Sequence, residues 1–198
     1  MTIIGSLIGY GVKMEVNFIG YKLSPLQETL LYNAINSGLD FLMSKRLKKT
    51  MIIDIRIVKD LIQTNKVWGD VSPEDEDRSP KIFEIRLNYS GVKSFEKLLE
   101  TLSHELVHLC QFATRRLYYF CDGDRTRFDG KHYSLTECKY DDRPWEIEAF
   151  WLEHQVFDAI IEKNKDIEKY IKEKSEKGWG YKAESELFST KSDYVRAA

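Results

Sequence analysis

Residues 104–108 read His-Glu-Leu-Val-His, an HExxH pattern in the middle of a long segment with helical periodicity. On an α-helix, positions four apart differ by only about 40° around the axis, so His104 and His108 present both imidazoles from one face. Glu105 lies about 100° from His104, where a carboxylate can hold a water molecule without taking a coordination position. The pattern therefore predicts a zinc site with two histidine ligands and Glu105 as the general base.

A catalytic zinc site needs a third protein ligand, because it keeps three protein ligands and leaves the fourth position to water. Residues 144–149 read Pro-Trp-Glu-Ile-Glu-Ala and open a further predicted helix. Glu146 and Glu148 lie about 200° apart on that helix, so only one of them can face the ion. Ala149, a small residue one turn after Glu146, suits a close approach of two helices and favours Glu146. Glu148 and His132 remain as alternatives.

Three long helices are expected to carry these residues. Apolar residues recur at helical spacing over 25–44, 94–117 and 145–162. Ser24, Pro25 and Gln27 have the residue types of an N-cap, a first helical position and a capping box, and Pro144 has the type that opens the third helix. The HExxH pattern therefore falls on the second of these helices.

Strands are predicted where apolar residues alternate or β-branched residues cluster, at 15–22, 51–58 and 81–88. We expect the strand at 81–88 to form the substrate-facing edge, since an extended peptide can add to a sheet edge by main-chain hydrogen bonds. The acidic segment 69–80 suits a loop or one arm of a hairpin. Residues 121–143 suggest an ordered loop with a short strand near 132–135.

Composition limits the remaining possibilities. The 198 residues are 42% hydrophobic and carry a formal charge of −2, which suits one folded domain and offers no net basic field for nucleic acid. No apolar run could cross a bilayer, no secretory signal opens the chain, and three scattered cysteines form no disulfide framework, so a cytoplasmic protein is expected. The predicted organisation is an N-terminal extension (1–14), one domain (15–174) and a polar tail (175–198).

HELVH at 104–108 followed by PWEIEA at 144–149 resembles the gluzincin metallopeptidases, whose third ligand is a glutamate on a later helix. Together with Gly-Lys-x-Tyr at 130–133, the chain is also similar to small HExxH proteins encoded by bacteriophages. The resemblance covers about 81–152. It implies an α+β, minimal zincin-like domain, in which a small, twisted, mostly antiparallel sheet packs on about three long helices.

The resemblance implies a zinc-dependent metallopeptidase that hydrolyses peptide bonds, with His104, His108 and Glu146 as metal ligands and a peptide or protein as substrate. Phe150 departs from the acidic residue that several gluzincin families have at this position, so any carboxylate behind a ligand must come from elsewhere. Two alternatives stay open: a catalytically idle zincin-fold module that binds a protein partner, and a DNA-associated protease like the SprT group. In the second alternative His132 would be the third ligand.

Two further groups of residues invite interpretation. The oxyanion of the reaction needs a donor, and the candidates from the loop are Tyr119, His132, Tyr133 and Tyr140. The arginines of 115–127 lie among acidic residues, which favours ion pairs or solvated loop charges over contacts with nucleic acid.

Overall fold

The computed structural model describes residues 13–20, 23–58, 61, 67–75, 79–88 and 94–176. The strands are β1 (Glu15–Gly20), β2 (Ile52–Val58), β3 (Gly69–Pro73), β4 (Ile82–Asn88), β5 (Leu117–Tyr119), β6 (Arg125–Phe128) and β7 (Lys131–Ser134). The helices are α1 (Pro25–Leu42), α2 (Lys45–Lys48), α4 (Phe95–Ala113), the 3-10 turn η1 (Tyr140–Asp142), α5 (Pro144–Lys163) and α6 (Lys165–Glu176). The chain is therefore a mixed α and β fold with three long helices, as the hydrophobic periodicity predicted.

A four-stranded sheet has the order β1-β2-β4-β3. The pairs β1–β2 and β2–β4 are parallel, and only β3 runs antiparallel to its neighbour β4. The expectation of a mostly antiparallel sheet is wrong for this sheet, because α1 connects β1 to β2 as a crossover helix and a crossover returns the chain in the same direction.

The sheet order also corrects the predicted edge. β4 (Ile82–Asn88) pairs on both sides, so the segment that we expected at the edge lies inside the sheet. β3 is the edge strand next to it, and it belongs to the acidic segment that suited one arm of a hairpin. β3 runs beside α4, which brings the edge of the sheet to the HExxH helix.

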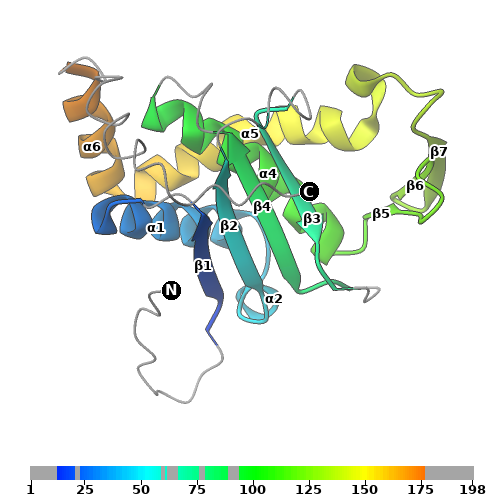
Figure 1. Ribbon diagram of the computed structural model, residues 1–198, viewed down its shortest axis with the longest axis horizontal. Coiled ribbons are helices and arrows are strands. Elements are labelled where there is room, and N and C mark those ends of the chain that lie inside the picture. The colour runs from blue at the N-terminus through cyan, green and yellow to red at the C-terminus, as the bar shows by residue number, and fades with distance from the viewer. Residues whose placement is uncertain are drawn as a thin grey trace.

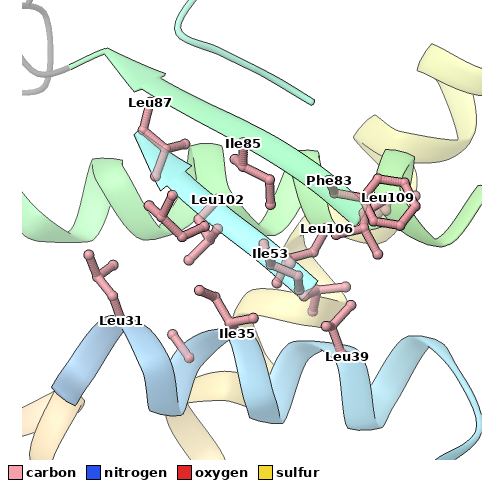
Figure 2. Close-up of a cluster of buried hydrophobic side chains, with 14 of the residues drawn as sticks. Leu31, Ile35, Leu39, Ile53, Phe83, Ile85, Leu87, Leu102, Leu106 and Leu109 are labelled. Atoms are coloured by element: carbon pink, nitrogen blue, oxygen red, sulfur yellow. The ribbon is translucent and has the colours of Figure 1, made fainter. Parts of the chain in front are cut away.

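The core lies between the sheet and the helices behind it (Figure 1). Side chains of alternate residues on β2 and β4 point to one face of the sheet, where they meet Leu31, Ile35 and Leu39 of α1 and the apolar side of α4 (Figure 2). The opposite face carries polar side chains, among them the ion pairs of Arg56 with Glu84 and of Arg86 with Asp70. One face of the sheet is thus buried under α1 and α4, and α5 packs against both helices.

The helix ends follow the predicted signals. Ser24 and Gln27 form a capping box, with the Ser24 hydroxyl accepting from the Gln27 N–H and the Gln27 side chain accepting from the Ser24 N–H. Ser94 caps α4 by accepting from the N–H of Lys97. Pro144 occupies the first turn of α5. Asn164 caps the C-terminal end of α5, and α6 begins at the next residue.

Residues 117–134, which cover the end of the predicted helix 94–117 and the first part of the predicted loop 121–143, contain more strand than expected, and α4 ends at Ala113. β5, β6 and β7 form an antiparallel three-stranded meander that stands at one end of the molecule, apart from the larger sheet (Figure 1). The predicted short strand near 132–135 corresponds to β7. Trp145 of α5 is fully buried, and the rings of Tyr119, Phe128 and Tyr133 from the meander surround it at centroid distances of 6.4, 6.1 and 5.6 Å. The meander therefore anchors the N-terminal end of α5.

Most of the predicted extension (1–14) and tail (175–198) lies outside the described residues. Met14, within that extension, is 5% exposed and belongs to the core cluster. Across the described ranges, every helix is too short or too polar to cross a bilayer.

Candidate metal centre

His104 and His108 of α4 come together with Glu146 of α5 at the buried interface between these two helices. Leu102, Leu106 and Leu109 are completely buried on the core side of α4, and this orients both histidines toward α5. Glu146 lies in the first turn of α5, and Ala149 one turn later is fully buried. The small Ala149 side chain lets the helices approach closely, as the sequence argument for Glu146 required.

The three donor atoms form a compact triangle. His108 Nε2 lies 3.1 Å from His104 Nε2 and 3.2 Å from Glu146 Oε2, and His104 Nε2 lies 3.4 Å from the same carboxylate oxygen. Two atoms bonded to zinc at about 2.0–2.1 Å with a tetrahedral angle between them lie about 3.3–3.4 Å apart. The side chain of His104 is 12% exposed, that of His108 is 9% exposed and that of Glu146 is 6% exposed. Spacing, burial and donor types therefore fit a metal ion with three protein ligands.

The remaining ring nitrogen of His104 is held by a carboxylate. His104 Nδ1 lies 2.9 Å from Oε2 of Glu153, which is two helical turns after Glu146 on α5. A carboxylate only accepts, so Nδ1 carries a proton, and in the neutral imidazole the Nε2 lone pair then faces the other two ligand atoms. Phe150 packs on the His104 ring with a centroid distance of 4.8 Å. Glu153 thus supplies the carboxylate that contacts the outer nitrogen of His104, a carboxylate that Phe150 cannot supply.

His108 is held in the same tautomer by an amide. Its Nδ1 lies 2.8 Å from Oε1 of Gln111, one turn further along α4. The Gln111 amide nitrogen donates to the carbonyl oxygen of Trp145 at 3.0 Å and to Glu148 at 2.8 Å. Because the amide nitrogen donates to both of these acceptors, the amide oxygen faces His108 and accepts from its Nδ1.

The electrostatics of the cluster favour charged forms. Burial lowers the pKa of His104 and of His108, but contacts with Glu146, and with Glu153 for His104, outweigh burial and raise both pKa values. Burial raises the pKa of Glu146, but hydrogen bonds from both histidines and from Tyr140 hold it far below the usual range. A strongly negative carboxylate between two imidazoles is the arrangement that a divalent cation stabilises.

Glu105 lies beside the triangle and is 5% exposed. Burial raises the pKa of its carboxyl group to about 8; His108 opposes this shift, and Asp70 and Glu146 add to it. The side chain lies against Gly69 of the edge strand, where an added Cβ would be 3.0 Å from Glu105 Oε1. Gly69 therefore permits the close approach of β3 to α4 at the predicted general base.

The alternative ligands lie elsewhere. Glu148 is not part of the donor triangle; its carboxylate accepts from Gln111 and from Arg116 Nη1 at 2.9 Å. His132 lies on β7 with its ring against Phe120 at a centroid distance of 5.5 Å, and it is exposed. The structure therefore brings Glu146, and neither Glu148 nor His132, to the two histidines.

Among the four candidates for an oxyanion donor, Tyr140 lies closest to the cluster by its interactions. Burial and the nearby Glu146 carboxylate raise the pKa of Tyr140 far above its usual range. Burial and the same carboxylate raise the pKa of Tyr119 to about 12. Tyr133 packs on Trp145 instead.

Glu153, Gln111 and Gly69 were not predicted from the sequence. Two of them carry a helical signal, because Gln111 follows His108 by three residues and Glu153 follows Glu146 by seven, so each shares a face with a ligand. Gly69 carried none, since its role depends on which strand is at the edge. The ion pairs expected for the loop arginines are confirmed for Arg116 with Asp129 and Arg125 with Asp122.

Comparison of the chain with known protein families, curated proteins and solved structures gives no match. The function must therefore be inferred from the geometry of the cluster and from the HExxH pattern.

Proposed function

We propose that the protein is a zinc-dependent metallopeptidase with a zincin-like fold, and that His104, His108 and Glu146 hold the metal. The observation that carries the proposal is the buried triangle of two imidazole nitrogens and one carboxylate oxygen, with Glu105 next to it on the same helix. Two nitrogens and one oxygen are a frequent ligand set of catalytic zinc sites in hydrolases. Zinc in such a site lowers the pKa of a coordinated water and polarises a carbonyl group.

Glu105 is the general base of the proposed reaction. Its buried carboxylate accepts a proton from the attacking water and passes it to the leaving amine. Burial raises the pKa of Glu105, and a divalent cation held by the neighbouring ligands would lower it toward the ionised form that a general base requires. Tyr140 is the proposed donor for the oxyanion, because the Glu146 carboxylate interacts with it strongly enough to raise the pKa of its hydroxyl.

The substrate in this proposal is an extended peptide that pairs with β3. Within the described residues, β3 is an edge strand of the larger sheet and pairs with β4 alone. Gly69 lets this edge approach Glu105 closely. A peptide that pairs with this edge would pass over the general base and the metal ligands. This places the role that we predicted for 81–88 on the next strand outward.

Two observations weigh against the DNA-associated alternative. His132, the residue that would imitate the third histidine of the SprT group, lies in the meander and not in the donor triangle. Arg116 and Arg125 are already ion-paired with aspartates.

Metal content and peptide cleavage test the proposal together. Purified protein should hold about one zinc per chain by elemental analysis, and His104→Ala and Glu146→Ala should each lose it. Glu105→Gln should keep the zinc and lose about 10²–10⁴-fold in cleavage of a mixed peptide library.

Glu162→Gln is the matched control, because this exposed glutamate also lies on α5. It should change neither metal content nor cleavage. A wild-type chain that takes up no zinc, or a Glu105→Gln variant that cleaves as fast as wild type, would contradict the proposal. A wild-type chain that binds zinc but cleaves no peptide would support the idle binding module instead.

A further inference from the structure

A continuous chain of hydrogen bonds runs from the ligand His108 to the surface of the meander. His108 Nδ1 donates to Gln111 Oε1 at 2.8 Å, and Gln111 Nε2 donates to Glu148 Oε2 at 2.8 Å. Arg116 Nη1 donates to the other oxygen of Glu148 at 2.9 Å. Arg116 also donates through Nε and Nη2 to the two oxygens of Asp129, at 2.8 and 2.7 Å. Every link of the chain therefore joins a donor to an acceptor.

The orientation of the Gln111 amide decides which His108 nitrogen is protonated. Gln111 is 1% exposed, so water offers it little alternative pairing. An amide that faces His108 with its oxygen keeps the proton on Nδ1 and leaves the Nε2 lone pair for a metal ion. A turned amide would present its NH₂ group to Nδ1 and favour the tautomer with the proton on Nε2. That tautomer cannot bind a metal through Nε2.

Glu148 and the carbonyl oxygen of Trp145 both hold the amide in the productive orientation, and Glu148 is the charged one of the two. A carboxylate cannot donate, so it can pair only with the nitrogen side of Gln111. Arg116 fixes the carboxylate, and the paired contacts to Asp129 fix the guanidinium. The chain leaves α4 just before Arg116 through Arg115, whose φ of +64° is in the left-handed region, and this turn brings Arg116 back toward Glu148.

We infer that Glu148 and Arg116 are positioning residues for the metal ligand His108 and act on it through Gln111. The inference rests on the proposed function, because it assumes that His108 binds a metal. It gives Glu148 a role that is different from the ligand role considered in the sequence. It also links the meander, through Asp129 and Arg116, to the metal centre.

The test is a rescue experiment on zinc affinity, measured by competition with a chromogenic chelator. Glu148→Ala should weaken zinc binding about 10–100-fold, the usual effect of losing an outer partner of a ligating histidine. Adding Gln111→Glu to Glu148→Ala should restore the affinity to within about threefold of wild type. The new carboxylate has no donor, so it can only accept from His108 Nδ1, and with alanine at position 148 it faces no second carboxylate there.

The visible absorption of the Co²⁺-loaded proteins gives a second readout, because it reports the geometry of the ligands. Glu148→Ala should alter the wild-type spectrum, and the double variant should recover it. Thermal unfolding of the metal-free proteins is measured alongside. A purely structural role for Glu148 would lower the unfolding midpoint and would not be rescued at position 111.

The outcomes separate this inference from the proposed function. If wild type binds no zinc, the proposed function fails and the inference fails with it. If wild type binds zinc while Glu148→Ala binds it equally well, or while Gln111→Glu brings no recovery, only the inference is overturned. Glu162→Ala, an exposed glutamate on the same helix, should match wild type in each measurement.

Discussion

The contact between Glu153 and His104 gives the most direct quantitative test of the metal centre. Glu153 Oε2 lies 2.9 Å from His104 Nδ1. The Glu153 side chain is 21% exposed and the His104 side chain is 12% exposed. A hydrogen bond to a charged partner contributes about 1.5–3 kcal/mol, which corresponds to about 10–100-fold in an equilibrium constant. Because Glu153 is partly exposed, water can replace some of the lost contact. Glu153→Ala should therefore weaken zinc binding by about tenfold, near the lower limit.

A conservative variant separates charge from hydrogen bonding. Glu153→Gln keeps an oxygen that accepts from Nδ1 but loses the charge, and charge-assisted hydrogen bonds are about twice as strong as neutral ones. Its zinc affinity should therefore fall only about threefold. The order wild type, Glu153→Gln, Glu153→Ala is the specific prediction, and chelator competition at fixed pH measures it.

The control and the refuting result are equally specific. Glu162→Ala removes an exposed carboxylate from the same helix and should leave zinc affinity unchanged. If Glu153→Ala binds zinc as tightly as wild type, the carboxylate does not tune His104, and the assignment of Nδ1 as its protonated nitrogen loses its support. If Glu153→Gln binds zinc more weakly than Glu153→Ala, the reasoning about charge is wrong.

Three other predictions follow from single contacts. Gly69→Ala places a Cβ 2.7 Å from Thr101 Cγ2 and 3.0 Å from Glu105 Oε1, so β3 and α4 must move apart at Glu105. Peptide cleavage should therefore fall about 100-fold while zinc content stays at one per chain; unchanged cleavage would show that β3 does not constrain Glu105. Tyr140→Phe removes the proposed oxyanion donor and should lower kcat about 100-fold with little change in KM. An effect on KM alone would assign Tyr140 to substrate binding. Burial raises the pKa of Cys110 from 9.0 to about 11, so at pH 8 it has about 100-fold less thiolate than an ordinary cysteine. Iodoacetamide should therefore label the exposed Cys121 first, as mass spectrometry of the native protein would show, and rapid labelling of Cys110 would refute its burial.

The three residues of the candidate metal site could be predicted from sequence because each depends on helical geometry. His104 and His108 share a face by their spacing, and Glu146 was distinguished from Glu148 by the small residue one turn after it. The structure places Ala149 at full burial and Glu146 at the histidines. Local periodicity determined these positions, and the packing of α4 on α5 then brought them together.

The outer contacts of the ligands needed knowledge of that packing. Gln111 and Glu153 share a face with a ligand, but so do other polar residues on the same helices. Only the relative position of α4 and α5 shows that Glu153 reaches His104 across the interface and that Gln111 reaches both His108 and the carbonyl of Trp145. A helical pattern gives the face of a residue and does not give its partner.

The sheet shows the same limit more strongly. β4 has Phe83, Ile85 and Leu87 buried on one face, and this alternation is compatible with an edge or an interior position and with parallel or antiparallel neighbours. The crossover through α1 makes β1 and β2 parallel, and the hairpin from β3 to β4 places the acidic segment at the edge. The polar composition that suggested a solvated loop at 69–80 is the composition that an edge strand tolerates, with Pro73 at its end. Pairing order depends on contacts between distant segments of the chain. The structure was therefore needed to identify β3 as the edge strand beside the HExxH helix.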